Sequence, residues 1–246
     1  MDQAIQRVLV ISACTGQKAT NCPNPMQYDH LKMRIADPEG FAVVESKLIV
    51  WKKHAAELFD GQGHNALKSV IYKKFEEKQL ALSWHIASAG YGLVDWNTPI
   101  IPYEFSFLNF STDLKQQRWG STLGLPQATN KVMSAPHDLC IICVGEAYLQ
   151  GLQLWTVPLA RFMPLTIVVG GGKGASSLVP AYKGGIFTHS PLSGNLALFK
   201  ANLVSYPTKF AAALLKSLGT YNSTQKLKTL FGSPANTIDQ EIGRFA

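Results

Sequence analysis

The sequence predicts an α/β fold, built as a three-layer sandwich around a mainly parallel central sheet. Apolar runs of strand length recur along the 246 residues, and segments with apolar side chains at helical spacing separate most of them. Loops with glycine or polar residues follow these runs. In a parallel sheet the loops at the carboxyl ends of the strands meet at one edge, where ligands bind in such folds.

The apolar patterning assigns each element in turn. Strands are expected at residues 7–13, 80–87, 139–144, 165–169 and 185–187. Helices, marked by apolar residues at spacings of three and four, are expected at residues 41–59, 65–78, 206–218 and in part of 149–161. We interpret the polar stretch 111–136, which carries Lys115, Arg118 and Trp119, as a helix and loop that lines a binding face.

The length of the chain allows one large domain with a sizeable core. We assign residues 1–220 to an α/β catalytic domain and residues 221–246 to a C-terminal tail of two short helices packed on it. The polar start of the chain lacks signal-peptide features, and no apolar run reaches about 18 residues. These features predict a cytoplasmic location and no membrane partner.

Two motifs resemble metal-binding or nucleotide-binding patterns, but we assign neither chemistry to them. Cys140 and Cys143 have CxxC spacing, but residues three apart on a strand point to opposite faces and are poor ligands for one metal. The glycine-rich stretch 170–174, which contains Lys173, matches neither the Walker pattern nor the dinucleotide-binding pattern. It suits a tight turn or a clamp on a nucleic-acid backbone. The sequence therefore predicts no metal and no cofactor.

The formal net charge of +7 favours a polyanionic partner. The basic side chains are spread over several segments, and the sequence does not place them on one face. Nucleic acid, most directly DNA, is the partner that we expect, and the oligomeric state stays open.

Three short motifs carry a resemblance to a known family. They are Ser-Ala-Cys-Thr-Gly-Gln-Lys at 12–18, Ser-Ala-Gly-Tyr-Gly-Leu at 88–93 and Ile-Pro-Tyr-Glu at 101–104. Together they resemble a prokaryotic family of uncharacterised domains. That family is similar to the uracil-DNA-glycosylase-like domains of archaeosine-type tRNA-modification enzymes and of peroxide-stress DNA-binding proteins, and to antiviral glycosylases that remove modified bases from phage DNA. A fourth segment, His-Ser-Pro-Leu-Ser at 189–193, resembles the His-Pro-Ser-Pro-Leu-Ser loop of uracil-DNA glycosylases.

The resemblance covers residues 7–110 by motif and residues 138–200 more loosely, and the chain departs from the pattern in two places. Uracil-DNA glycosylases carry an aspartate in the first loop, whereas this chain has no carboxylate from Cys14 to Tyr28. Ser190 stands where the glycosylase loop has proline. A catalytic acid must therefore come from another loop, or catalysis is absent.

The resemblance and the chemistry of glycosidic cleavage together nominate the site residues. A carboxylate stabilises the sugar cation or orients water, and we assign this role to Asp95 or Glu104. His189 is assigned to the departing base. The residues expected to bind substrate or nucleic acid are Cys14, Gly16, Gln17, Lys18, Tyr91, Tyr103, Glu146, Tyr148, Lys173, Ser190, Ser193 and Asn195.

Each nominated group also has a structural alternative. Asp95 is also suited to cap a turn, and Glu104 to pair with Lys18 or lie on the surface. The alternative for His189 is a buried structural histidine. The tyrosines are either stacking platforms for an extruded base or ordinary core aromatics.

The resemblance therefore implies a uracil-DNA-glycosylase-like fold. Its expected activity is a DNA glycosylase that flips out a modified base, cleaves its N-glycosidic bond and leaves an abasic site. Two alternatives stay open. One is a hydrolase or ribosyltransferase acting on small nucleosides or nucleotides, and the other is a non-catalytic nucleic-acid-binding module. A tRNA-modifying role is a variant of the first expectation.

Overall fold

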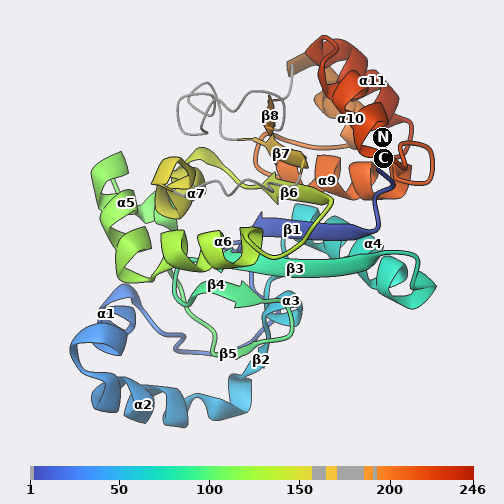
Figure 1. Ribbon diagram of the computed structural model, residues 1–246. Coiled ribbons are helices and arrows are strands. Elements are labelled where there is room, and N and C mark those ends of the chain that lie inside the picture. Colours follow the sequence, from blue (N-terminus) through green and yellow to red (C-terminus); the bar gives the residue numbers. More distant parts are fainter. Residues whose placement is uncertain (1–2, 157–164, 171–185, 191–192) are drawn as a thin grey trace.

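The computed structural model describes residues 3–156, 165–170, 186–190 and 193–246 of the chain (Figure 1). Its centre is a six-stranded sheet in which one edge strand, β4, is antiparallel to its neighbour and every other pairing is parallel. In order across the sheet, the strands are β4 (Gly92–Asp95), β3 (Ala81–Ser88), β1 (Arg7–Ala13), β6 (Leu139–Cys143), β7 (Leu165–Val169) and β8 (Ile186–His189). The predicted α/β class and the five predicted strands are confirmed.

Helices cover the sheet in an arrangement compatible with the predicted three-layer sandwich. In Figure 1, α6 lies in front of the sheet with α5 and α7 beside it, whereas α4 and α9 pack together behind it. The helices are α1 (Tyr28–Ala36), α2 (Pro38–Lys47), α3 (Ala55–Leu58), α4 (Gln62–Glu77), α5 (Asp113–Thr122), α6 (Leu125–Met133), α7 (Glu146–Leu152), α9 (Tyr206–Ser217), α10 (Thr224–Phe231) and α11 (Ala235–Gly243). Short 3₁₀ turns occur at η1 (Ile49–Trp51), η2 (Phe107–Asn109), η3 (Leu154–Thr156) and η5 (Ser193–Phe199). None of the helices in the described ranges is long and apolar enough to span a membrane.

Central strands are apolar at consecutive positions because helices bury both of their faces. Val8, Leu9, Val10 and Ile11 of β1 are all fully buried, and every residue of β6 and β7 is buried. The two cysteines of β6 are free and buried, and burial raises the pKa of the Cys143 thiol to about 12. These thiols therefore pack as small apolar groups.

The prediction of one helix over residues 41–59 is wrong. The chain there forms α2, η1, a short strand β2 (Lys53–His54) and α3, in that order. β2 pairs with β5 (Pro99–Ile100), and the amides of Ala55 and Ala56 donate to carbonyls at Thr98 and Trp96. The apolar spacing predicts that these two amides donate to carbonyls four residues earlier in a helix, but they donate to a distant segment instead.

The stretch 88–104, which starts at the last residue of β3, contains the two strands β4 and β5, neither of which the apolar patterning predicts. Ser88 Oγ accepts from the amides of Gly90 and Tyr91 and thereby stabilises a tight turn after β3. Gly92 then has φ +79°, and a Cβ there would lie 2.8 Å from the carbonyl oxygen of Leu123. The chain consequently reverses into β4, which runs back along β3.

The C-terminal segment forms two short helices, as predicted, and these are α10 and α11. The buried carboxylate of Asp239 on α11 accepts from the Tyr206 hydroxyl at 2.6 Å and lies 2.8 Å from Nε2 of His189. Nδ2 of Asn195 donates to its second oxygen at 2.9 Å. Burial favours the neutral acid, but these hydrogen bonds outweigh it and lower the pKa of Asp239. This cluster ties α11 to β8 and α9.

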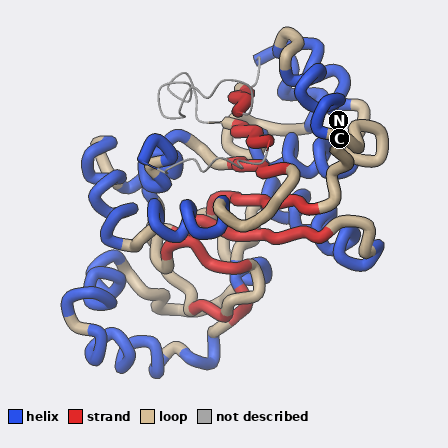
Figure 2. The backbone as a smooth tube through the Cα atoms, viewed as in Figure 1, coloured by secondary structure: helices blue, strands red, loops and turns tan. Residues whose placement is uncertain are grey.

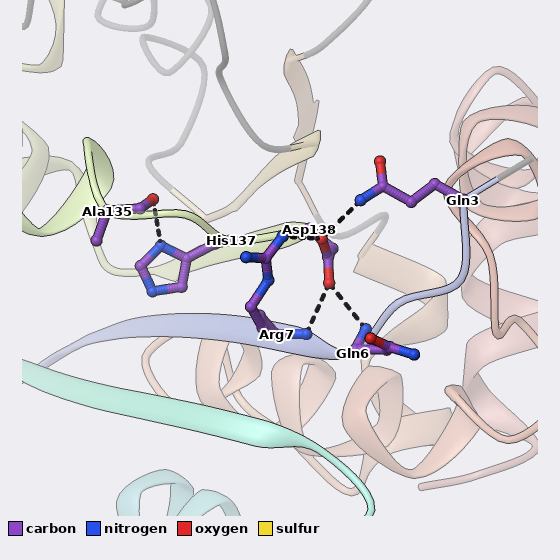
Figure 3. A network of polar contacts seen from close by, with 6 residues as sticks. All are labelled: Gln3, Gln6, Arg7, Ala135, His137 and Asp138. Atoms are coloured by element: carbon purple, nitrogen blue, oxygen red, sulfur yellow. Dashed lines mark hydrogen bonds and ion pairs between the residues drawn. The ribbon is translucent and has the colours of Figure 1, made fainter. Parts of the chain in front are cut away.

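A second buried carboxylate belongs to Asp138, which lies at the amino ends of the parallel strands, just before β6 begins (Figure 3). Its oxygens accept from the backbone amides of Gln6 and Arg7 and from the side chains of Gln3 and Arg7, at 2.8–2.9 Å. Burial would raise the pKa of Asp138, yet the Arg7 guanidinium and the two amides outweigh burial and lower it. Asp138 therefore holds the segment before β1 against the start of β6.

Candidate functional site

The order of the strands places a switch point at β1. The second parallel strand along the chain, β3, lies on one side of β1, and the third, β6, lies on the other. Connections leave the carboxyl ends of β1 and β6 in opposite directions, and a crevice opens between them. A cavity of about 1080 Å³ lies there, and we call it the main cavity.

Loops and helix starts line the main cavity. The carboxyl ends of β1 and β6 and the segments after them contribute residues 13–17 and 143–148. The starts of α4 and α9, with the residues just before them, contribute residues 61–64, 202–205, 207 and 208. The two helix starts approach closely, because a Cβ on Gly63 would lie 2.1 Å from Thr208 Oγ1 and 3.0 Å from the Ser205 carbonyl oxygen. Helix N-termini carry partial positive charge. The wall formed by α4 and α9 therefore favours an anionic or electron-rich ligand.

The floor of the main cavity contains a buried polar network. Cys14 Sγ lies 3.0 Å from the Tyr148 hydroxyl and 3.4 Å from the Tyr103 hydroxyl, which lies 2.6 Å from Ser88 Oγ. Burial, and then the neighbouring Cys14, raise the pKa of both phenols well above the ordinary value, so both stay protonated at neutral pH. This network brings together the motifs at 12–18, 88–93 and 101–104, which are far apart in the sequence.

One carboxylate lines the main cavity among the described residues, and it belongs to Glu146. Glu146 is the first residue of α7 and is exposed, and its carboxylate makes no hydrogen bond or ion pair within the described part of the chain. Since nothing in that part occupies its oxygens, this carboxylate is available to a ligand. Gly16 and Gln17, also exposed, line the same cavity.

Lys18 turns away from the main cavity. Its Nζ donates to the carbonyls of Thr15 and Gly16, both at 3.0 Å, and lies 5.0 Å from the centre of the Tyr103 ring. Burial lowers the pKa of this ammonium, while Cys14 and Glu104 oppose the shift. Lys18 therefore stabilises its own loop, and it is not among the residues that line the main cavity.

The two carboxylates nominated for catalysis lie outside the main cavity. Asp95 sits opposite His85 on β3, because β4 carries it back toward the amino edge, and its Oδ1 accepts from the Asn97 amide at 2.9 Å. Asp95 therefore caps a turn, which was the structural alternative to a catalytic role. Glu104 is exposed and lines a separate hollow beside α1 and α5.

His189 is enclosed rather than open to a ligand. Only 2% of it is exposed, and its Nε2 lies 2.9 Å from the Tyr206 hydroxyl and 2.8 Å from Asp239. Its neighbours Thr188 and Ser190 line the main cavity, so His189 stands behind the wall that they form. The structure corrects the expectation that this imidazole faces the leaving base.

Some of the remaining nominated residues line the main cavity, and others do not. Tyr148 lines the main cavity, whereas Tyr103 is fully buried beneath it. Tyr91 bridges Glu45, to which its hydroxyl donates, and the Ile101 amide, from which it accepts. Tyr103 has no exposed face for stacking a base, and the Arg34 guanidinium lies over the Tyr91 ring, 5.3 Å from its centre. Asn195 binds Asp239, Ser193 begins η5, and Lys173 lies outside the described residues.

Sequence reasoning missed two ionisable residues near the site, His64 and Asp239. His64 Nε2 lies 2.9 Å from the Ala56 carbonyl, its Nδ1 has no partner in the described ranges, and burial lowers its pKa to about 4. The ring is fully buried within the wall of the main cavity. Glycines 61 and 63 just before it were a usable signal for close packing at a helix start. Asp239 had no local signal, because His189 lies 50 residues away in the sequence.

Comparison of the chain with models of known protein families, with curated proteins and with solved structures found no match. The class that the structure defines is an α/β protein with a ligand-sized cavity at the switch point of a mainly parallel sheet.

Proposed function

We propose that the main cavity is the active site of an N-glycosylase that acts on a nucleobase in nucleic acid, in a fold of the uracil-DNA-glycosylase type. The observation that carries the proposal is Glu146, the one exposed carboxylate that the described residues contribute to a cavity also lined by two helix N-termini. The sequence motifs support the same conclusion, because they meet in the network beneath that cavity.

In this mechanism Glu146 takes the place first given to Asp95 or Glu104. Its carboxylate accepts a proton from a water molecule that attacks C1′ of the sugar, and it stabilises the positive charge that develops there. The bond between C1′ and the base nitrogen breaks, and its electron pair leaves with the base. The positive ends of α4 and α9 stabilise the negative charge on that base.

The network of Cys14, Tyr148 and Tyr103 has a positioning role in this proposal. Its members are buried and hydrogen-bonded to one another, so they hold the loop after β1 and the start of α7 in fixed relation. Glu146 lies two residues before Tyr148 on α7. Preorganisation of this kind keeps a catalytic group within reach of the reacting atom.

A second candidate function is hydrolysis of small nucleosides or nucleotides. The observation in its favour is that no lysine or arginine of the described residues lines the main cavity. Strong binding of a nucleic-acid backbone needs cations near the phosphates. The two functions share the same chemistry and differ in the substrate beyond the target nucleoside.

Release of free base is the direct test. The protein is incubated with normal DNA, DNA carrying modified bases, RNA and free nucleosides, and released bases are identified by mass spectrometry. We expect release from at least one nucleic acid, and loss of at least about 100-fold in rate in Glu146→Gln. Glu76→Gln, which changes an exposed carboxylate at the far end of α4, is the matched control and keeps the wild-type rate.

Two results would count against the proposal. One is intact glycosidic bonds in every substrate, and the other is a Glu146→Gln variant as active as the control. Release from free nucleosides but from no polymer would favour the second candidate function.

A further inference from the structure

A second hollow, of about 830 Å³, lies between α1 and α5, and we call it the aromatic cleft. Tyr28, Phe105 and Phe110, all partly exposed, line it together with the exposed cations Lys32, Lys115 and Arg118. Glu104 is the one carboxylate in its described lining. The aromatic cleft therefore combines ring surface with an excess of positive charge.

The rings in the aromatic cleft form a compact cluster. Tyr28 and Phe105 are stacked with centroids 4.5 Å apart, and Phe110 meets Phe105 edge-on at 5.2 Å. Trp119 lies 5.1 Å from Tyr28 at 69°, and its Nε1 donates to the Ala89 carbonyl. This packing fixes the partly exposed rings in place, so a flat ligand meets a preformed surface.

The cations differ in whether a carboxylate already neutralises them. Lys32 pairs with Asp29 at 2.6 Å and lies over the Tyr28 ring. Lys115 donates to Ser111 Oγ at 3.5 Å, and neither Lys115 nor Arg118 pairs with a carboxylate among the described residues. Both stand on α5 three positions apart, which puts them on one face of that helix. They are available to an anionic ligand.

The aromatic cleft adjoins the main cavity through one short segment, residues 104–110. Ser106 and Leu108 of this segment line the main cavity, while Phe105, Asn109 and Phe110 line the aromatic cleft. Leu108 is 75% exposed on the ridge between them. A ligand that crosses this ridge occupies both hollows.

We infer that the aromatic cleft binds the single-stranded stretch of nucleic acid next to the nucleotide held in the main cavity. Phosphates meet Lys115 and Arg118, and an unstacked base lies against Phe105 and Phe110, the combination by which proteins hold single strands. The position relative to the target nucleotide rests on the proposed function, but binding in the aromatic cleft can be measured without any reaction.

Binding of fluorescently labelled oligothymidylate, followed by anisotropy over a range of salt concentrations, tests the inference. We expect the double variant Lys115→Glu, Arg118→Glu to bind at least tenfold more weakly, and the salt slope to fall by about 0.7 for each lost phosphate contact. Lys228→Glu makes a charge change of the same sign at an exposed position of α10, on another side of the molecule (Figure 1), and keeps wild-type binding. Phe110→Leu keeps an apolar side chain but loses the ring, and should weaken binding by about fivefold or more.

Three outcomes would overturn the inference. They are wild-type affinity in the double variant, an equal loss in Lys228→Glu, and equally tight binding of a polyglutamate peptide of matched charge. Thermal melting of each variant separates lost binding from lost folding. Oligothymidylate binding requires no glycosidic cleavage, and Glu146→Gln changes the main cavity without touching the aromatic cleft, so either proposal can fail while the other stands.

Discussion

A carboxylate lies at each end of the parallel strands of the central sheet, and the surroundings of the two carboxylates differ. We call these ends the amino edge and the carboxyl edge of the sheet. At the amino edge, the oxygens of Asp138 accept four hydrogen bonds and the side chain is 2% exposed (Figure 3). At the carboxyl edge, Glu146 is exposed at the main cavity and has no partner within the described residues. Asp138 comes just before β6 and Glu146 just after it, so the two carboxylates lie at opposite ends of this strand, next to loops that Figure 2 draws in tan.

This difference separates a structural acid from a chemically available one. A buried carboxylate with saturated oxygens stabilises the fold and has no capacity left for a ligand. An exposed carboxylate in a cavity contributes little to stability but can accept a proton or stabilise a cation.

The largest expected effect concerns the two acids themselves. Asp138→Ala leaves the amides of Gln6 and Arg7 without an acceptor in a partly buried position, so the free energy of unfolding should fall by about 3 kcal/mol. Glu146→Ala should change it by less than about 0.5 kcal/mol. Urea unfolding at pH 7 measures both. Arg7→Gln is the control, because it keeps both amides and should cost less than half as much as Asp138→Ala. Equal losses at the two edges would remove the distinction.

A pH effect extends the comparison to His64, beside the main cavity. Its pKa is about 4 in the folded protein and about 6.5 when unfolded, so between these values the unfolded chain binds the extra proton. Stability should therefore fall as the pH drops from about 6.5 to about 4, by up to roughly 3 kcal/mol. The lowered pKa of Asp138 adds a separate loss at lower pH, as this carboxylate becomes protonated. Urea midpoints across this range measure the slope, and His64→Gln should flatten its upper part. A slope identical to that of the wild type would contradict this account.

Asp239 sharpens the comparison because it lies near the carboxyl edge yet is saturated like Asp138. Asp239→Asn retains one acceptor oxygen and should lower the free energy of unfolding by about 2 kcal/mol. Hydrogen exchange should accelerate in α11, which this carboxylate ties to β8 and α9. Exchange that rises equally in β1 would mean that Asp239 supports the whole sheet instead. Asp239→Asn should resemble Asp138→Ala in kind, which would show that saturation rather than location decides the role.

The smallest effect is expected in the network beneath the main cavity. Tyr103→Phe removes the hydroxyl that joins Ser88 and Cys14, but Ser88 keeps the amides of Gly90 and Tyr91. The loss in unfolding free energy should therefore be about 1 kcal/mol. Base release should decline further than this loss alone explains if the network positions Glu146. A rate unchanged in Tyr103→Phe would remove that positioning role.

The strands and most helices could be predicted from local patterns. Buried parallel strands need consecutive apolar residues, and residues 7–13 and 165–169 show this pattern in the sequence. The same logic placed Cys14, Gln17 and Glu146 after strand ends, and these residues do line the main cavity. Their roles in binding and catalysis stay predictions.

Other features depend on partners far away in the chain. The break in the expected helix 41–59 follows from pairing of β2 with β5, and Asp95 leaves the site because β4 reverses along β3. His189 is enclosed by Tyr206 and Asp239, which no spacing near His189 reveals. Apolar periodicity reports whether a segment is buried, because burial acts on each residue locally. Which acid is left exposed is decided by contacts between distant segments, and only the folded chain brings those together.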